Sequence, residues 1–297
     1  MKHVVVTGAA GLLGRHVAAA FRQAGWQVTA TDRRDDGDGG LVVADLRDEA
    51  EARRLVDGAD CVTHIASIPR PVGYEARDVF DTNMSLIYSV LGGMEATGVS
   101  RLVFASSFSI LGLPFAPRPV DIAYLPIDEA HPAAPQDVYA VTKWLGEEMV
   151  DAWVRRTGSS AVSIRMPWIQ TAEGFARDVV ARRARPESHL DLWSYIDARD
   201  AGEAFVLAAD APTTSHERLY IAAADTYSEE PTDDLVARHY PDVRYGGVTG
   251  THGAVISTEK ARTTIGFQPR YGWRDYAGVP TEATSAEAGA GHPDEKG

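Results

Sequence analysis

A glycine-rich turn directly after an apolar run constrains the fold more than any other feature of this sequence. Three valines at positions 4–6 precede glycines at positions 8, 11 and 14. Such glycines permit a tight turn and let the backbone approach a pyrophosphate, which then lies at the positive end of the following helix. The order of strand, turn and helix predicts a dinucleotide-binding domain. We expect cofactor contacts from Gly8, Gly11, Leu12, Leu13 and Gly14.

Short apolar runs alternate with longer helical patterns through the first two thirds of the chain, which is typical of βαβ units and a parallel sheet. We expect strands at residues 3–7, 27–31, 40–44, 61–65, 101–106 and 161–165, and crossover helices at 12–24, 49–56, 79–97 and 138–156. Beyond residue 166 the pattern is less regular: a compact helical stretch is followed by the run at 193–197, a helix near 200–209, a strand near 219–222 and a helix near 231–239. The predicted fold is α/β, a Rossmann-type doubly wound parallel sheet with a small C-terminal substrate-binding lobe.

The predicted organisation is one nucleotide-binding domain with one small lobe. The NAD(P)-binding domain covers residues 1–165, and residues 191–224 return to it. Residues 166–190 and 225–279 form the substrate lobe. Residues 280–297 are small, polar and aperiodic, which predicts a disordered tail.

Composition narrows the class of protein. The 297-residue chain is 44% apolar, so it can bury a full core, and its formal charge of −13 argues against binding to nucleic acid or to anionic lipid. No apolar run reaches the ~18 residues of a membrane span, and the first strand meets glycine too soon for a signal peptide. The single cysteine, Cys61, lies in an apolar run and is expected to be a buried thiol. We expect a cytoplasmic protein without a metal site.

A tyrosine and a lysine supply the predicted chemistry. Tyr139 and Lys143 are spaced i, i+4 on an expected helix, so the phenol and the ammonium lie on one face. A positive charge nearby favours the phenolate and lowers the pKa of a tyrosine from its usual value of about 10. Together with the dinucleotide site, the pair predicts hydride transfer with Tyr139 as the general base.

Asp32 bears on the choice of cofactor. It ends the second expected strand, at the distance where an acidic side chain accepts hydrogen bonds from the adenosine ribose hydroxyls. A carboxylate there favours NAD, because it repels a 2′-phosphate. Arg33 and Arg34 follow directly, and guanidinium groups bind phosphate well, although they fit a solvated charge run equally. NAD is therefore expected, and NADP stays open.

Taken together, these residues resemble the extended short-chain dehydrogenase/reductases, the NAD-dependent epimerase/dehydratase group. The resemblance covers roughly residues 1–225, and its motifs are Thr7, Gly8, Gly11, Gly14, Asp32, Asp45, Leu46, the His-Ile-Ala-Ser run at 64–67, Asn83, Ser106, Ser107, Tyr139 and Lys143. It implies that Asp45 and Leu46 flank the adenine, that the backbone of Ala66 packs on the cofactor, and that Lys143 also holds the nicotinamide ribose. Asn83 and His64 are equally compatible with purely structural hydrogen bonds.

Ser107 is the expected third member of the reacting centre. It follows the fifth expected strand, at the carboxyl edge of the sheet where ligands of such folds bind. In the family this position holds the substrate hydroxyl and stabilises its oxygen as charge develops. Ser106 is the near alternative, but the placement of Ser107 relative to Gly112 makes Ser107 the better candidate.

Two departures from the family narrow the substrate. Nucleotide-sugar dehydratases carry an Asp-Glu pair after the serine, where this chain has Phe108 and Ser109, and the segment 166–192 is short and lacks the family's sugar-nucleotide elements. The compact form is shared with uronate dehydrogenases, so we expect a modest-sized substrate such as a sugar, a uronic acid or a secondary metabolite. The expected substrate contacts are Ser67, Ser107, Phe108, Ser109, Tyr139 and Trp168. Residues 110–119 are a further candidate wall, in which Leu111, Leu113 and Phe115 either face the substrate or pack beneath a loop.

The leading function is therefore an NAD(P)-dependent oxidoreductase that interconverts a secondary alcohol and a ketone. A nucleotide-sugar epimerase with tightly bound NAD is the alternative enzyme, and a non-catalytic NAD(P)-sensing protein is the alternative of another class. Four arginines at 177, 182, 183 and 185 are expected to spread around a helix and to be mostly solvated, so the pocket should not hold a nucleotide diphosphate. The expected partner is a small-molecule substrate, and the resemblance also implies a homodimer, because the family often dimerises through its two long helices, here 79–97 and 138–156.

Overall fold

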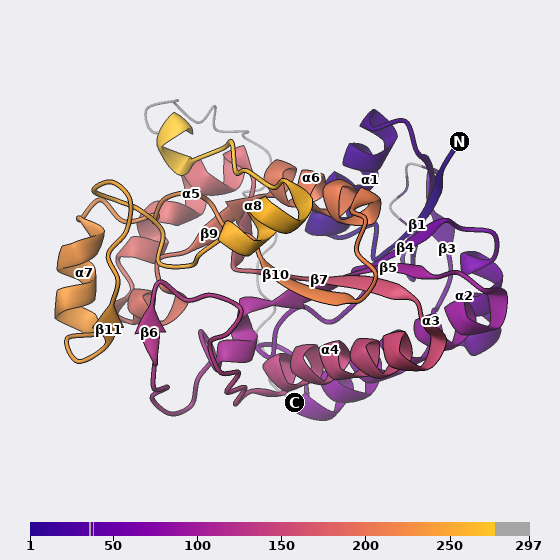
Figure 1. Ribbon diagram of the computed structural model, residues 1–297, viewed down its shortest axis with the longest axis horizontal. Helices are drawn as coiled ribbons and strands as arrows, with labels where there is room; N and C mark the ends of the chain where they lie inside the picture. Colours follow the sequence, from indigo (N-terminus) through magenta and orange to yellow (C-terminus); the bar gives the residue numbers. More distant parts are fainter. Residues whose placement is uncertain (36, 38, 277–297) are drawn as a thin grey trace, which may run out of the picture.

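The computed structural model describes residues 1–35, 37 and 39–276, and a seven-stranded parallel sheet forms its centre (Figure 1). Across the sheet the order is β10, β7, β5, β4, β1, β2, β3. The strands are β1 His3–Thr7, β2 Gln27–Asp32, β3 Val42–Val43, β4 Cys61–His64, β5 Arg101–Ser107, β7 Ser160–Met166 and β10 His216–Tyr220. Strand order reverses between β1 and β4, the switch point at which such sheets bind ligands. The predicted fold class is confirmed.

Helices cover both faces of the sheet (Figure 1). They are α1 Leu12–Gln23 and α6 Ala198–Asp210 on one face, and α2 Glu49–Val56, α3 Ala76–Thr97 and α4 Val138–Thr157 on the other. Val4 and Val6 belong to the core under α1 and α6, whereas Val5 belongs to the core under α2, α3 and α4. Successive side chains of a strand point to opposite faces, and here both faces are buried. This explains why the first strand is an unbroken apolar run.

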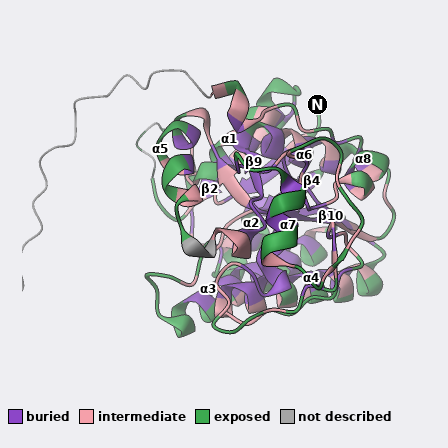
Figure 2. Cartoon of the chain, turned by 90° about the vertical axis from the view of Figure 1, so that its left-hand side faces the viewer, coloured by how far each residue is buried: buried purple, intermediate pink, exposed green. Residues whose placement is uncertain are grey.

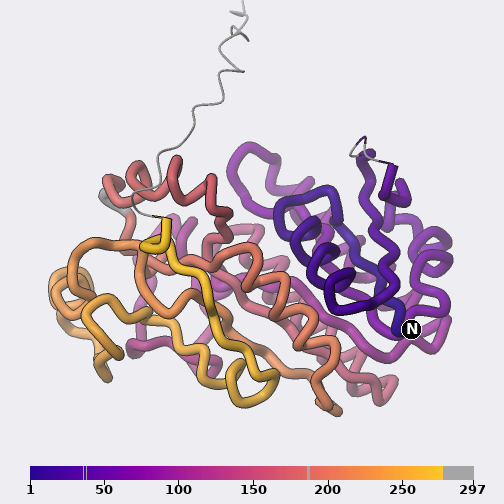
Figure 3. Tube along the Cα trace, turned by 90° about the horizontal axis from the view of Figure 1, so that it is seen from above, coloured from indigo at the N-terminus to yellow at the C-terminus, as the bar shows by residue number. Residues whose placement is uncertain are grey.

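The remaining elements gather at one end of the sheet. They are β6 Tyr124–Leu125, β8 Trp168–Gln170, α5 Ala172–Arg183, β9 Tyr195–Asp197, α7 Thr232–His239, β11 Arg244–Tyr245 and α8 Glu259–Ile265, with the short helices η1 Phe108–Leu111, η2 Pro186–Asp191 and η3 Trp273–Tyr276. Here β8 pairs with β9, and β6 with β11. Figure 2 shows the solvent side of α7 exposed, and Figure 3 shows the N-terminal elements and most of the C-terminal elements at opposite ends of the molecule. The division into a nucleotide-binding domain and a lobe stays a prediction.

Several predicted boundaries were wrong. The strand expected at 40–44 has two residues, α3 begins three residues earlier than expected, and β8 was not predicted as a strand. The strand expected at 219–222 instead spans His216–Tyr220. This strand lies at the edge of the sheet, and its first residues are polar because their side chains pair with α4. His216 and Arg218 both contact the carboxylate of Asp151. The tail predicted at 280–297 lies outside the described residues.

The sequence predicts neither a membrane span nor a metal site. Within residues 1–35, 37 and 39–276 no helix is long and apolar enough to cross a membrane. The same residues contain no group of three or more His, Cys, Asp or Glu side chains that could hold a metal ion. Cys61 is fully buried, and burial raises the pKa of its thiol to about 12, so the thiol is part of the core as expected.

Candidate active site

A cavity of about 910 Å³ lies at the switch point of the sheet. This volume is near the upper end of the ~300–1,000 Å³ typical of small-molecule sites. Its lining includes every residue that the sequence nominated for cofactor or substrate: Gly8, Gly11, Leu12, Leu13, Gly14, Asp32, Arg33, Asp45, Leu46, Ala66, Ser67, Ser107, Phe108, Ser109, Tyr139, Lys143 and Trp168. The structure thus brings these residues together, while their individual roles stay predictions.

Two of the motif glycines cannot be replaced without displacing the backbone. Gly8 has a φ of +71°, and a Cβ atom there would lie 2.7 Å from the amide nitrogen of Ala66. A Cβ atom on Gly14 would lie 2.1 Å from the carbonyl oxygen of Gly8. The missing side chains therefore let the ends of β1 and β4 and the first turn of α1 meet closely.

The local structure fits a dinucleotide. Gly11 caps α1 without a side-chain hydrogen bond, and the first turn contains no acidic residue, so its amide groups are free to bind an anion. At the end of β2, the carboxylate of Asp32 accepts hydrogen bonds from the amides of Ala10 at 3.2 Å and Arg34 at 3.1 Å. A pyrophosphate thus fits at α1, and the ribose hydroxyls fit at Asp32.

Beyond Asp32, the adenine end of the cavity has mixed charge. Asp45 accepts hydrogen bonds from the Arg47 side chain, which lower the pKa of the Asp45 carboxyl, and the neighbouring Leu46 is buried. Arg33 lines the cavity as an exposed side chain, and Arg34 lies 3.8 Å from Asp32. The region therefore combines the carboxylate that favours NAD with the arginines that kept NADP open.

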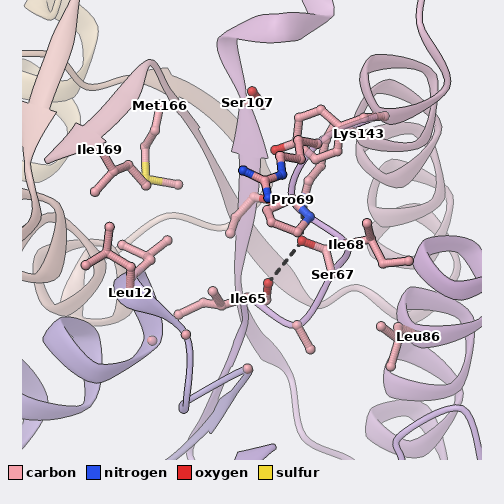
Figure 4. Close-up of a pocket in the computed structure, with 18 of the residues that line it drawn as sticks. Leu12, Ile65, Ser67, Ile68, Pro69, Leu86, Ser107, Lys143, Met166 and Ile169 are labelled. Atoms are coloured by element: carbon pink, nitrogen blue, oxygen red, sulfur yellow. Dashed lines mark hydrogen bonds between the residues drawn. The ribbon is translucent and has the colours of Figure 1, made fainter. Parts of the chain in front are cut away.

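Ser107, Tyr139 and Lys143, the expected reacting centre, lie together in the cavity. Ser107 ends β5, the other two lie in the first two turns of α4, and all three side chains are buried. Figure 4 shows Ser107, Lys143 and Ser67 around the same cavity. Lys143 Nζ donates to the carbonyl of Ala105 at 2.8 Å and to Ser67 Oγ at 3.3 Å. The ammonium is therefore held at the carboxyl end of β5.

The predicted lowering of the tyrosine pKa is wrong for these residues by themselves. Burial raises the pKa of Tyr139 to about 12, although a hydrogen bond with Ser107 acts in the opposite direction. Lys143 Nζ lies 5.6 Å from the centre of the Tyr139 ring, and burial lowers the pKa of Lys143 to about 7. Removal from water disfavours the charged form of each group. A phenolate in this position therefore needs a further positive charge beside it.

The two adjacent serines point to different partners. Ser107 Oγ donates to Ser109 Oγ at 2.9 Å and accepts from the Ser109 amide at 3.1 Å. Ser106 Oγ instead donates to Glu147 Oε1 at 2.6 Å. The alternation of side chains along β5 thus directs Ser107 to the reacting centre and Ser106 toward α4, which favours Ser107 for the catalytic position.

The structural interpretation of Asn83 and His64 fits the contacts. Asn83 accepts from the Ile68 amide at 2.7 Å and donates to Thr142 Oγ1 at 3.0 Å, so it ties the loop after β4 to α4. His64 is buried beside Thr7, with a nitrogen-to-oxygen distance of 3.0 Å, and burial lowers its pKa to about 3. A histidine that is neutral near pH 7 suits a core hydrogen bond.

The substrate end of the cavity is mostly apolar. Phe108, Phe115 and Trp168 line it, whereas Leu111 and Leu113 do not; these two leucines pack with Phe108 in the core behind the cavity wall. Within residues 110–119, Phe115 therefore faces the cavity, whereas Leu111 and Leu113 pack beneath the loop.

The expectation that the four arginines at 177, 182, 183 and 185 are solvated holds for Arg177 and Arg185 but was wrong for Arg182 and Arg183. Arg177 is exposed, but the side chains of Arg182 and Arg183 are each only 18% exposed. The Arg182 guanidinium lies 4.1 Å from the centre of the Trp168 ring and pairs with Asp191. Arg182 and Arg185 both line the cavity. Helical spacing alone could not reveal this, because the aromatic and acidic partners come from distant segments.

Sequence reasoning also missed Glu147, a buried carboxylate one helical turn after Lys143. Its oxygens accept hydrogen bonds from Arg165 at 2.7 and 2.9 Å, from Arg218 at 2.9 Å and from Ser106. Burial by itself would raise the pKa of Glu147, but the bonds and charge of Arg165 hold it below its usual range. The available signal was the i, i+4 repeat that continues from Tyr139 through Lys143 to Glu147.

Comparisons with known proteins agree with this geometry. Residues 4–223 match the family described as the NAD dependent epimerase/dehydratase family. An L-arabinose 1-dehydrogenase (NAD(P)(+)) from Haloferax volcanii is 30% identical over 58% of this chain and 69% of its own length. A UDP-glucose 4-epimerase from Corynebacterium glutamicum is 24% identical over 90% of this chain and 91% of its own length.

A solved structure gives the same result for the fold. A short-chain dehydrogenase/reductase superfamily protein from Agrobacterium tumefaciens, crystallised with bound NAD, superimposes with a TM-score of 0.71 at 23% identity. The superposition covers 93% of this chain and 94% of the other. At this level of identity the likeness concerns the fold alone.

Proposed function

This chain belongs to the NAD-dependent epimerase/dehydratase family of extended short-chain dehydrogenase/reductases, and on that premise we propose that it is a dehydrogenase that oxidises a sugar hydroxyl with NAD. Membership makes it an NAD(P)-dependent enzyme, which leaves the non-catalytic sensing alternative without support. The observation that carries the proposal is that Ser107, Tyr139 and Lys143 meet in the cavity that the dinucleotide turn also lines.

The proposed chemistry follows from what each side chain can hold or accept. Bound NAD⁺ would accept a hydride from the sugar carbon, and its positively charged ring would lower the pKa of a buried phenol beside it. The Ser107 hydroxyl would hold the sugar oxygen, and the Tyr139 phenolate would take the proton from that oxygen. Lys143 would favour the phenolate by its charge. The sugar loses one hydride and one proton and gains a C=O bond, with NADH and one proton as the other products.

The residues after Ser107 argue against elimination of water. Phe108 is apolar, and the Ser109 hydroxyl is hydrogen-bonded to Ser107. Neither is an ionisable acid or base in the ordinary pH range. A dehydratase needs such a pair, whereas a dehydrogenase needs only the three residues already described.

The proposal is tested by following NADH formation with a panel of aldoses and uronic acids. We expect turnover of at least one sugar with formation of one NADH for each sugar oxidised. The proposal fails if no member of the panel yields NADH while the protein is folded and binds NAD.

A nucleotide-sugar epimerase is the second candidate, and the observation in its favour is the position of Arg182 and Arg185 on the cavity. An epimerase keeps its cofactor and forms no net NADH. We expect NAD to be removed on gel filtration and UDP to bind no more tightly than millimolar. Copurified NAD together with micromolar UDP affinity, both measurable by absorbance and calorimetry, would put the epimerase first.

We also predict a preference for NAD over NADP. Asp32 can accept from both ribose hydroxyls, and hydrogen bonds to a charged group contribute about 1.5–3 kcal/mol, so we expect at least ~10-fold tighter binding of NAD. Asp32→Asn should reduce this ratio. The control is Asp35→Asn, because Asp35 is exposed and does not line the cavity. Calorimetric titration measures both ratios, and tighter binding of NADP by the unaltered protein would contradict the assignment.

We further propose that two copies associate through α3 and α4. These helices pack side by side and expose Phe80, Tyr88 and Trp144, which are 39%, 59% and 38% accessible. Exposed aromatic side chains on adjoining helices are typical of association surfaces. Light scattering after gel filtration measures the oligomeric state, and a monomer at micromolar concentration would refute the proposal.

A further inference from the structure

The charge of the cavity is opposite to that of the protein. The whole chain carries a formal charge of −13. Among the described residues that line the cavity, the acidic side chains are Asp32 and Asp45, whereas the basic ones are Lys143 and six arginines: Arg33, Arg34, Arg47, Arg70, Arg182 and Arg185. A cleft with one sign of charge concentrates ligands of the opposite sign and speeds their association. The surplus therefore indicates anionic ligands.

The cofactor accounts for part of this surplus. Its pyrophosphate is negative, and the arginines at 33, 34 and 47 lie beside the acids of the adenine end, where Arg34 approaches Asp32 and Arg47 pairs with Asp45. Arg182 and Arg185 belong to α5 and the residues that follow it, next to Trp168 at the other end of the cavity. The cofactor's phosphates do not explain these two.

Arg182 is held in a fixed position. Its Nε donates to Asp191 Oδ2 at 2.7 Å and its Nη2 lies 2.5 Å from the same oxygen. Asp191 is itself buried and accepts further hydrogen bonds from the Tyr227 hydroxyl at 2.5 Å and the Trp193 amide at 3.2 Å. With the ring of Trp168 beneath the guanidinium, the side chain loses little freedom on binding a ligand.

The donors of Arg182 that remain are on the other side of the guanidinium. The guanidinium also interacts with the Tyr227 hydroxyl, and its remaining N–H donors are left for a ligand in the cavity that Arg182 lines. The Arg185 side chain is exposed and has neither a hydrogen bond nor an ion pair within the described residues. Asp191 thus balances one positive charge, and the second is offset only in part by the carboxylate of Asp178, whose pKa is lowered first by its bond with Arg177 and also by the nearby charges of Arg182 and Arg185. Guanidinium groups with free N–H donors suit carboxylate and phosphate oxygens.

We infer that the sugar substrate carries an oxyanion, a carboxylate or a phosphate, which Arg182 and Arg185 bind at the end of the cavity formed with Trp168. This inference rests on the proposed dehydrogenase function and adds the substrate class. Ser107 and Tyr139 act on the hydroxyl that is oxidised, whereas the two arginines hold the substituent and orient the ring. An anchor of this kind raises kcat/KM more than it changes the chemistry.

The test compares three sugars with the same ring that differ only at C6: D-glucose, D-glucuronate and D-glucose 6-phosphate. We expect kcat/KM for one of the two anionic sugars to exceed that for glucose by at least ~10-fold, and to fall as ionic strength is raised, while the value for glucose stays level. The better of the two anions identifies carboxylate or phosphate as the source. A protein that forms NADH equally well from all three remains a dehydrogenase, but the inference is overturned.

Three variants separate binding from folding. Arg185→Gln removes a guanidinium that lines the cavity and should reduce the preference for the anionic sugar over glucose at least ~10-fold, without weakening the binding of NAD. Arg182→Lys keeps a positive charge beside Asp191 but loses the planar set of N–H donors, so it should also reduce the preference for the anionic sugar. The control, Arg177→Gln, removes an exposed arginine of α5 that does not line the cavity and should change neither value.

Binding provides a readout independent of turnover. Calorimetry with D-glucuronate and with inorganic phosphate, on protein saturated with NADH, should show saturable binding that Arg185→Gln weakens and added salt reduces. If no sugar yields NADH but this binding is present, the dehydrogenase proposal fails and the anion site stands. If Arg185→Gln lowers glucose and anion turnover alike, or binds both anions as tightly as the unaltered protein, the inference is refuted.

Discussion

Tyr139→Phe should reduce turnover by at least ~10²-fold, the usual effect of removing a general acid or base, while cofactor affinity stays within a factor of a few. The phenol hydroxyl is the only atom removed, and the ring keeps its place in the small cluster with Ile68 and Val79. NADH formation under saturating sugar and calorimetric titration with NAD measure the two quantities.

The matched control for this prediction is Tyr88→Phe. Tyr88 is a tyrosine on α3 that is 59% exposed and does not line the cavity. The same atom is removed, so a general effect of losing a hydroxyl would appear in both variants. Retention of more than about a tenth of the turnover in Tyr139→Phe would exclude the proposed role.

The pH dependence separates the roles of Tyr139 and Lys143. Burial brings the pKa of Lys143 to about 7, so its ammonium loses its proton near neutral pH unless a ligand stabilises it. In the proposed mechanism Tyr139 reacts as the phenolate, and the charged form of Lys143 stabilises that phenolate. The negative charge of a bound anionic sugar or of the cofactor's phosphates favours the ammonium, which couples ligand binding to the reactive state.

The first two thirds of the fold could be predicted because burial on both faces leaves a strong pattern. Strands such as Cys61–His64 and Arg101–Ser107 are fully buried and read as apolar runs. The start of β10 could not be predicted from apolarity, since His216 and Arg218 face acids of α4 rather than an apolar layer. The strands β3, β6 and β11 have only two residues each, which is too short for an alternating pattern of apolar and polar residues to be recognised.

The same contrast holds for the site. The glycine turn and the pair Tyr139 and Lys143 are local motifs whose spacing is itself the signal. The Arg182 side chain is held by Trp168 and Asp191, which come from segments before and after α5. The spacing of residues within one helix cannot predict contacts with such distant segments. The reading of α5 as a solvated helix failed for that reason.

One stripe of α4 connects the reacting centre to the edge of the sheet. Tyr139, Lys143, Glu147 and Asp151 follow one another at i, i+4, so they lie on one face of the helix. The first two reach the cavity, and the last two bind the arginine and histidine of β7 and β10. Glu147 thus binds α4 to Ser106, the neighbour of Ser107, and we propose that it positions the expected catalytic residues from outside the cavity.

Glu147→Gln should destabilise the protein by about 3–5 kcal/mol, the usual cost of removing one partner of a buried ion pair. Arg165 is only 6% exposed and would keep a charge without its partner, and one of the two carboxylate oxygens would become an NH2 donor that faces arginine donors. The control is Glu148→Gln, because Glu148 is 50% exposed and its contact with Arg218 should contribute about 1 kcal/mol or less. Urea unfolding measures both free energies.

The difference between Glu147→Gln and the unaltered protein should depend on pH with a defined sign. The folded state lowers the pKa of this carboxyl, so its stabilisation is present above the unfolded value of about 4.3 and is lost as the pH falls through the folded value. We therefore expect a constant difference between pH ~6 and ~8 and a shrinking one below ~4.3. A difference that grows on acidification, or a loss no larger than that of Glu148→Gln, would show that the buried network does not hold α4 in place.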